Sequence, residues 1–160
     1  MSTQPAQPYP GELATAKDIR LLADHYRKAA HLLQPMGQPG DPLSRAPFRL
    51  AAIHAIELYL NALLLHRGLD PRQIRGMQHD LALRAQLANS SGLHLRARTA
   101  AHLRTVAEQR EYLATRYGPG SPHAPSQINR LAATLDEVAR KVTLLLQPRQ
   151  STTGSNGGRE

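Results

Sequence analysis

The chain has 160 residues, a net charge of +8 and no cysteine. Without thiols it cannot form disulfides, thiolate nucleophiles or cysteine-ligated zinc and iron–sulfur sites, which excludes several classes of enzyme. Leu and Ala dominate its apolar residues, with only five Tyr, one Phe and no Trp, a composition that favours helices over strands, and its length fits a single domain.

Both ends of the chain lack the pattern of a folded core. Residues 1–11 carry three prolines and residues 148–160 are rich in Ser, Thr and Gly, so we expect a flexible arm, a domain over residues 12–147 and a disordered tail. No apolar run approaches the roughly 20 residues that cross a bilayer, and the first residues do not resemble a signal peptide. These features predict a cytoplasmic protein with no membrane partner.

The first two predicted helices cover residues 12–33 and 44–67. Gln34-Pro35 ends the first helix, and Gly68 stands where a left-handed cap ends the second. In the first helix the spacing predicts a buried stripe of Leu13, Ala16, Ile19, Leu22, Tyr26, Ala29 and Leu33. In the second it predicts buried Phe48, Ala52, Ile53, Ile56, Leu60, Leu63 and Leu64.

The second half of the domain predicts a loop or short turn at 71–76, a shorter helix at 79–88 and a long helix at 95–117. A last helix follows Pro125, with Ser126 as its N-cap. No segment alternates with a period of two. The expected fold is therefore all-α, an antiparallel bundle of four to five helices.

Three short segments give this helical pattern a family resemblance. They are Ala55-Ile56-Glu57 in the second helix, His79-Asp80-Leu81 after Gly68, and Tyr112 followed by Arg116-Tyr117. In their order and spacing they resemble the HEPN family over residues 12–147, although Asn61 stands where that family usually has Lys and Gly118 separates Tyr117 from Pro119. The resemblance implies a HEPN-type bundle, a homodimer, and binding of nucleotide or RNA.

The resemblance also implies where chemistry would occur. Catalytic HEPN proteins are metal-independent ribonucleases that use an Arg and a His four to six residues apart, and Arg116 and His123 have six residues between them. A guanidinium binds phosphate through two parallel hydrogen bonds, and an imidazole exchanges protons near neutral pH. We expect Arg110, Arg116 and Tyr117 to contact the nucleotide or RNA.

Two other Arg–His pairs do not fit the motif. Arg49 and His54 fall on different faces of their helix, and Arg98 and His102 share a face but are too close in the sequence.

Glu57 and His79 are polar residues among apolar ones, and a buried charge needs a partner. We therefore expect them to be structural, paired with each other or with Arg110 or Arg116.

The eight histidines show no metal-ligand spacing, and no nucleotide-fold or hydrolase motif is present, so we expect neither a metal nor a cofactor. Three functions remain open at this point. The first is a nucleotide- or RNA-binding HEPN-like domain, with a toxin–antitoxin or defence system as its expected setting. The second is a non-catalytic module that partners a nucleotidyltransferase, and the third is a metal-independent endoribonuclease.

Overall fold

The structure is a computed structural model that describes residues 7–118 and 126–148. Residues 1–6 of the expected arm (1–11) and residues 149–160 of the expected tail (148–160) lie outside the described residues, as does His123. The described residues are all-helical: 74% are in helices and none is in a strand. The α-helices are α1 (Ala16–Leu33), α2 (Ala46–His66), α3 (Pro71–Gly76), α4 (Leu81–Ser90), α5 (Ala97–Glu108), α6 (Glu111–Tyr117) and α7 (Ile128–Leu146).

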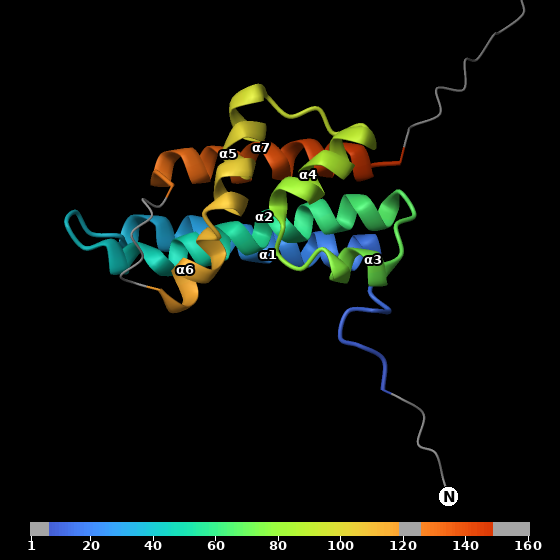
Figure 1. The fold of residues 1–160 in the computed structure, drawn as a ribbon, viewed down its shortest axis with the longest axis horizontal. Helices are drawn as coiled ribbons and strands as arrows, with labels where there is room; N and C mark the ends of the chain where they lie inside the picture. The colour runs from blue at the N-terminus through green and yellow to red at the C-terminus, as the bar shows by residue number, and fades with distance from the viewer. Residues whose placement is uncertain (1–6, 119–125, 149–160) are drawn as a thin grey trace, which may run out of the picture.

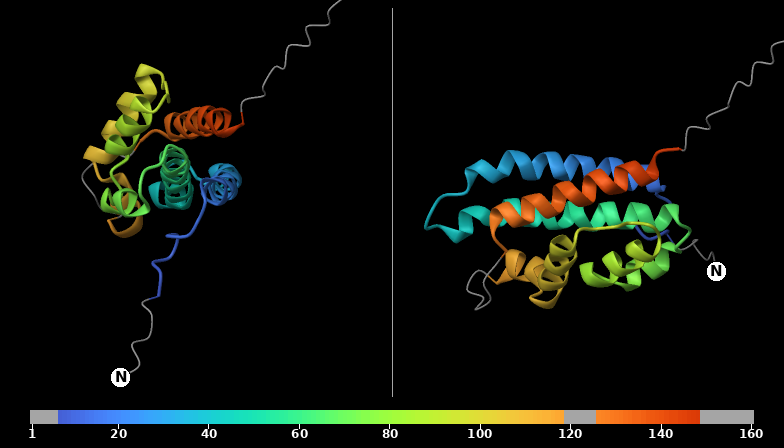
Figure 2. Two further views of the ribbon diagram at one scale, coloured as in Figure 1. Left: turned by 90° about the vertical axis from the view of Figure 1, so that its right-hand side faces the viewer. Right: turned by 90° about the horizontal axis from the view of Figure 1, so that it is seen from above.

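The three long helices, α1, α2 and α7, lie side by side (Figures 1 and 2). Helix α1 runs against α2, and two short 3₁₀ turns, Gln34–Met36 and Pro42–Arg45, join them. Helices α2 and α7 run in the same direction, because α3 to α6 carry the chain back between them (Figure 2). The antiparallel arrangement that the sequence predicted therefore holds for α1 and α2 but not for α2 and α7.

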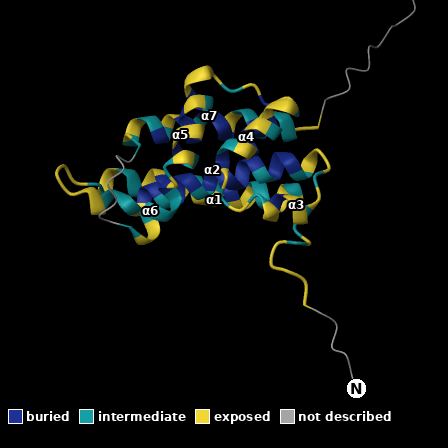
Figure 3. Ribbon diagram, in the orientation of Figure 1, coloured by how far each residue is buried: buried dark blue, intermediate teal, exposed yellow. Residues whose placement is uncertain are grey.

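Helix α2 is the centre of the core. Of its 21 residues 14 are buried, as is typical of a helix surrounded by other helices, and all of its predicted core residues are among them (Figure 3). By length and composition, Pro42–His66 is also apolar enough to cross a membrane, contrary to the expectation that no run approaches this length. In this fold, 78% of that apolar window is buried inside the protein.

The stripe predicted for α1 is partly wrong. Ala23 and Ala30 are fully buried, and Ile19 and Leu33 pack against the core. Leu13 precedes the helix and is exposed, because the helix begins only after Thr15, whose side chain forms a capping box with Asp18. The close-packed face therefore uses small residues, which allow α1 to lie near α2.

The helix predicted over 95–117 is two helices. Helix α5 ends at Glu108, and Arg110 adopts a left-handed backbone with a φ of 49° before α6 begins. The turn directs Glu111 into the interior, where it meets Arg49 of α2. The apolar spacing of the sequence could not show this break, because Arg110 is neither Gly nor Pro.

Two helix starts also differ from the predictions. Residues 71–76 form a short helix, α3, because Asp70 and Gln73 make a capping box and Pro71 occupies the first turn. Ser126 is not the N-cap of α7: the cap is Gln127, without a side-chain hydrogen bond, and the hydroxyl of Ser126 donates to Glu111 instead. Gly68 has a φ of 91°, the left-handed geometry expected after α2.

Candidate functional site

The three segments that resemble HEPN motifs meet at one place in the fold. Nδ1 of His79 lies 3.0 Å from Oε2 of Glu57 on α2. The His79 ring also packs on the Tyr112 ring of α6, with the ring centroids 4.4 Å apart. We call these three residues the motif cluster. Of the pairings considered from the sequence, the structure has Glu57 with His79.

A buried arginine supports the motif cluster. Arg84 of α4 is only 2% exposed; its Nε donates to Oδ1 of Asn61 at 2.7 Å, and Nη2 lies 3.9 Å from Oε1 of Glu57. Its remaining bonds go to the carbonyls of Ile74, Met77 and Asp80. Burial lowers the pKa of Arg84, and the carboxylate of Glu57 partly restores it. Sequence reasoning missed Arg84, although a lone Arg among apolar residues of a helix was a signal for it.

The charges of Glu57 and Arg116 both act on His54. It is half-buried on α2, one turn before Glu57, and its ring makes an edge-on contact with Tyr26 of α1, with centroids 4.5 Å apart. Burial lowers the pKa of His54, Glu57 raises it, and the positive charges of Arg116 and His79 lower it further. The charge of Arg116 therefore acts on the side of α2 that carries Glu57.

The residues predicted to bind nucleotide or RNA are exposed at the two ends of α6. Arg110 lies at the turn before the helix, and Arg116 and Tyr117 lie in its last turn, with Tyr117 76% exposed. A seven-residue helix is about 10 Å long, which sets the separation of its two ends. The structure does not place His123 relative to Arg116, because His123 lies outside the described residues.

The other two Arg–His pairs are not assembled as sites. Arg49 pairs with Glu111, whereas His54 contacts Tyr26. His102 is buried, 2.8 Å from the Thr134 hydroxyl through Nδ1 and 2.7 Å from the Ser126 hydroxyl through Nε2, while Arg98 is exposed. Burial lowers the pKa of His102, and the nearby charge of Glu111 opposes that effect.

A second polar network, inside the protein, was not predicted. Oε1 of Glu111 lies 3.0 Å from Nη1 of Arg49, and Oε2 accepts the Ser126 hydroxyl at 2.6 Å. Arg49 also donates to the Ser126 carbonyl. Together with His102 these residues join α2, α5 and α6 to the segment that enters α7, so their role is to hold the helices in place.

Neither a family model, a curated protein nor a solved structure matches this chain. Functional conclusions therefore rest on its own residues and their positions. In the described ranges, no group of three or more histidine and carboxylate side chains is placed to hold a metal ion. The chemistry that the exposed residues of α6 offer is cationic contact from Arg110 and Arg116 and an aromatic face from Tyr117.

Proposed function

We propose that this chain is a HEPN-like, cytoplasmic helical domain that binds nucleotide or RNA. The observation that carries the proposal is the contact of His79 with both Glu57 and Tyr112, because each of these residues comes from a different motif segment. Glu57 and His79 are 22 residues apart in the chain, and His79 and Tyr112 are 33 residues apart. Their contacts make the three segments parts of one structural unit, as expected if the spacing of the segments reflects a common family pattern.

The phosphate-binding surface of this proposal is the exposed side of α6. Arg116 and Arg110 supply guanidinium groups for phosphate oxygens, and Tyr117 supplies a ring on which a base stacks. The net charge of +8 adds a general attraction for polyanions. A homodimer would double this surface. We keep ribonuclease activity by Arg116 and His123 as a property to be tested in the same experiments.

The runner-up is a protein-interaction module that partners a nucleotidyltransferase in a toxin–antitoxin or defence system. Its support is the apolar exposed side of α1, where Leu21, Leu22 and Leu32 are 42%, 44% and 67% exposed. In this alternative Arg116 is dispensable, so the two functions predict opposite results for the same substitution.

Binding of a labelled single-stranded RNA, followed by fluorescence anisotropy at several salt concentrations, tests the proposal. Arg116→Ala should weaken binding and reduce the slope of log affinity against log salt by about one. Arg140→Ala is the matched control, because Arg140 is also exposed but lies on α7. Equal binding by the two variants would overturn the phosphate-binding role of Arg116.

Cleavage of a mixed RNA pool in EDTA tests catalysis separately. Cleavage that both Arg116→Ala and His123→Ala abolish would make the chain a metal-independent ribonuclease. An intact pool, combined with binding that depends on Arg116, would leave RNA or nucleotide binding as the function.

A further inference from the structure

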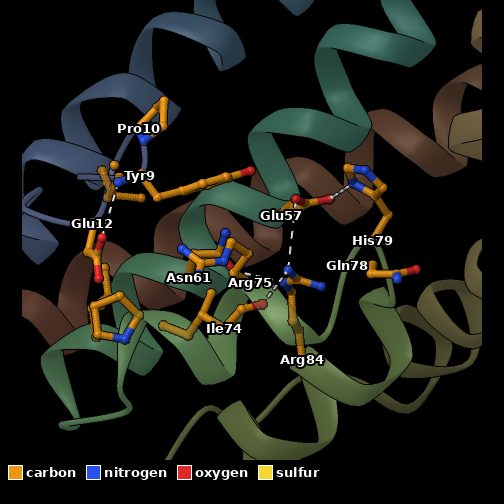
Figure 4. A pocket seen from close by; sticks show the side chains of 14 residues that line it. Tyr9, Pro10, Glu12, Glu57, Asn61, Ile74, Arg75, Gln78, His79 and Arg84 are labelled. Carbon is orange, nitrogen blue, oxygen red and sulfur yellow. Dashed lines mark hydrogen bonds and ion pairs between the residues drawn. The ribbon is translucent and has the colours of Figure 1, made fainter. Parts of the chain in front are cut away.

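A pocket of about 630 Å³ adjoins the motif cluster (Figure 4). Helix α2 and the region of α3 and α4 form its walls, and residues 9–12 close one side. Its size falls within the range of small-molecule sites, which are about 300–1,000 Å³. The surface proposed above for phosphate lies on α6, and no residue of α6 lines this pocket.

Two side chains on α2 present complementary hydrogen-bonding groups to the pocket. Oε2 of Glu57 is paired with His79, but Oε1 is 3.9 Å from Arg84, too far for a hydrogen bond, and has no donor among the described residues. One turn along, Asn61 accepts from Arg84 through Oδ1, so its amide nitrogen is left to donate. Glu57 therefore offers an acceptor next to the donor of Asn61.

The pocket also has a flat wall. The guanidinium carbon of Arg75 lies 4.3 Å from the centroid of the Tyr9 ring, so a cation and an aromatic ring are layered at the side of the pocket (Figure 4). Apolar side chains of Ile19, Leu65 and Ile74 complete the lining. Such a combination suits a planar ligand with apolar faces and a polar edge.

The charges of the lining oppose an ionic ligand. Glu12 and Glu57 balance Arg75 and Arg84, and each of the two arginines already has a partner within the protein. A phosphate or a polyamine would therefore gain little net attraction here.

The polar groups are held rigidly. Arg84 binds the carbonyls of Ile74, Met77 and Asp80, which ties α3 to the start of α4 and fixes Asn61 at the same time. Preorganised groups bind a ligand with little further cost of ordering.

We propose that this pocket binds a guanine base, whose N1–H and N2 amino group donate to Glu57 and whose O6 accepts from Asn61. Guanine presents two adjacent donors beside an acceptor, which matches a carboxylate next to an amide donor. The inference deepens the proposed function, since it makes the favoured ligand a guanine nucleotide or a guanine in RNA.

The test uses nucleosides, which lack phosphate, so that it is independent of Arg116. Titration calorimetry of the full chain should show guanosine binding, with inosine about tenfold weaker because it lacks the amino group. Glu57→Gln should weaken guanosine by about tenfold or more, and Tyr9→Ala by about fivefold or more. Tyr9 is 56% exposed, so its substitution leaves the core intact even if Glu57→Gln disturbs folding.

Arg104→Ala and Arg140→Ala are the controls, because both residues are exposed and lie outside the pocket. Each should leave guanosine affinity unchanged. The guanine pocket would be overturned if guanosine, inosine and adenosine bound with equal affinity, or if adenosine bound more tightly than guanosine. It would also be overturned if Tyr9→Ala left the affinity for guanosine unchanged. If guanosine does not bind while RNA binding still depends on Arg116, the pocket inference fails and the proposed function stands. Guanosine binding without RNA binding would support the pocket alone.

Discussion

Arg49 and Glu111 form a buried ion pair, 3.0 Å between Nη1 and Oε1, that connects the start of α2 to the start of α6. Both side chains are at least 90% buried, so each charge depends on the other for compensation. Glu111→Gln should lower the free energy of unfolding by about 3–5 kcal/mol, because it leaves the guanidinium buried without its partner. Denaturation in urea measures this loss.

The double variant Arg49→Met with Glu111→Leu is the control for that experiment. It removes both charges and fills their volume with apolar groups, so it should be more stable than Glu111→Gln alone. If Glu111→Gln lowered the free energy of unfolding by less than about 1 kcal/mol, the pair would contribute no more than an exposed ion pair does. That result would contradict its role as a buried pair that holds α2 and α6 together.

Arg116 should contribute to the titration of His54. Burial is the main cause that lowers the pKa of His54, and the positive charge of Arg116 lowers it further. Arg116→Gln should therefore raise that pKa only part of the way towards its ordinary value. A titration of the His54 ring protons by NMR measures the change. Arg110→Gln is the control, because it removes an equal charge before the first turn of α6 and should leave the pKa of His54 unchanged. If both variants changed this pKa equally, Arg116 would not be the residue whose charge acts on His54.

Glu137 should protect the fold against moderate acid. Burial raises its pKa, but hydrogen bonds from Lys141, Thr99 and the backbone of Arg96 outweigh this effect and hold the pKa at about 2, against 4.5 for a free glutamate. A carboxylate with a depressed pKa stabilises the folded state above its unfolded pKa. The stabilisation is therefore complete above about pH 4.5 and is lost as the pH falls towards 2.

Glu137→Gln provides the measurement. The variant should be less stable than the native chain at pH 7, by on the order of 2–3 kcal/mol, and the difference should shrink between pH 4.5 and 2. Urea unfolding at several pH values gives both free energies. A difference that does not vary with pH would show that Glu137 contributes by packing rather than by charge.

The backbone at Arg110 stores strain that glycine can release. A φ of 49° costs about 1 kcal/mol for a residue with a β-carbon, and the side chain is exposed. Arg110→Gly should therefore raise the thermal midpoint slightly, with a gain of about 0.5–1 kcal/mol. Arg110→Ala removes the same side chain while keeping the β-carbon, so it should show no gain. Equal midpoints for the two variants would argue against strain.

The sequence predicted best where apolar spacing alone determines structure. The seven core residues predicted for α2 from its three- and four-residue steps are all buried. On α1 the same rule predicted that Leu22 and Tyr26 are buried, but both are exposed. Spacing alone does not show which of two apolar stripes faces the core, and here small residues such as Ala23 allow closer packing than the large ones.

The site was harder to predict, because its contacts join distant segments. The motif pattern drew attention to Glu57 and His79, but not to Arg84, which lies 3.9 Å from Glu57 and lines the same pocket. Nor does the sequence show that Tyr9, in a segment expected to be flexible, contacts Arg75. These contacts depend on how α3 and α4 turn, and a left-handed residue such as Gln78 (φ 49°) leaves no reliable mark in sequence composition.

The central position of α2 also has a consequence for biosynthesis. Its partner α7 is the last helix in the part of the chain that the structure describes, and more than 60 residues separate the end of α2 from the start of α7. On the ribosome, a chain that elongates at about 5–20 residues per second would expose this apolar helix for several seconds before α7 emerges. During that time α2 is a natural binding segment for chaperones, and α1, already synthesised, is the first element of the chain available to shield it.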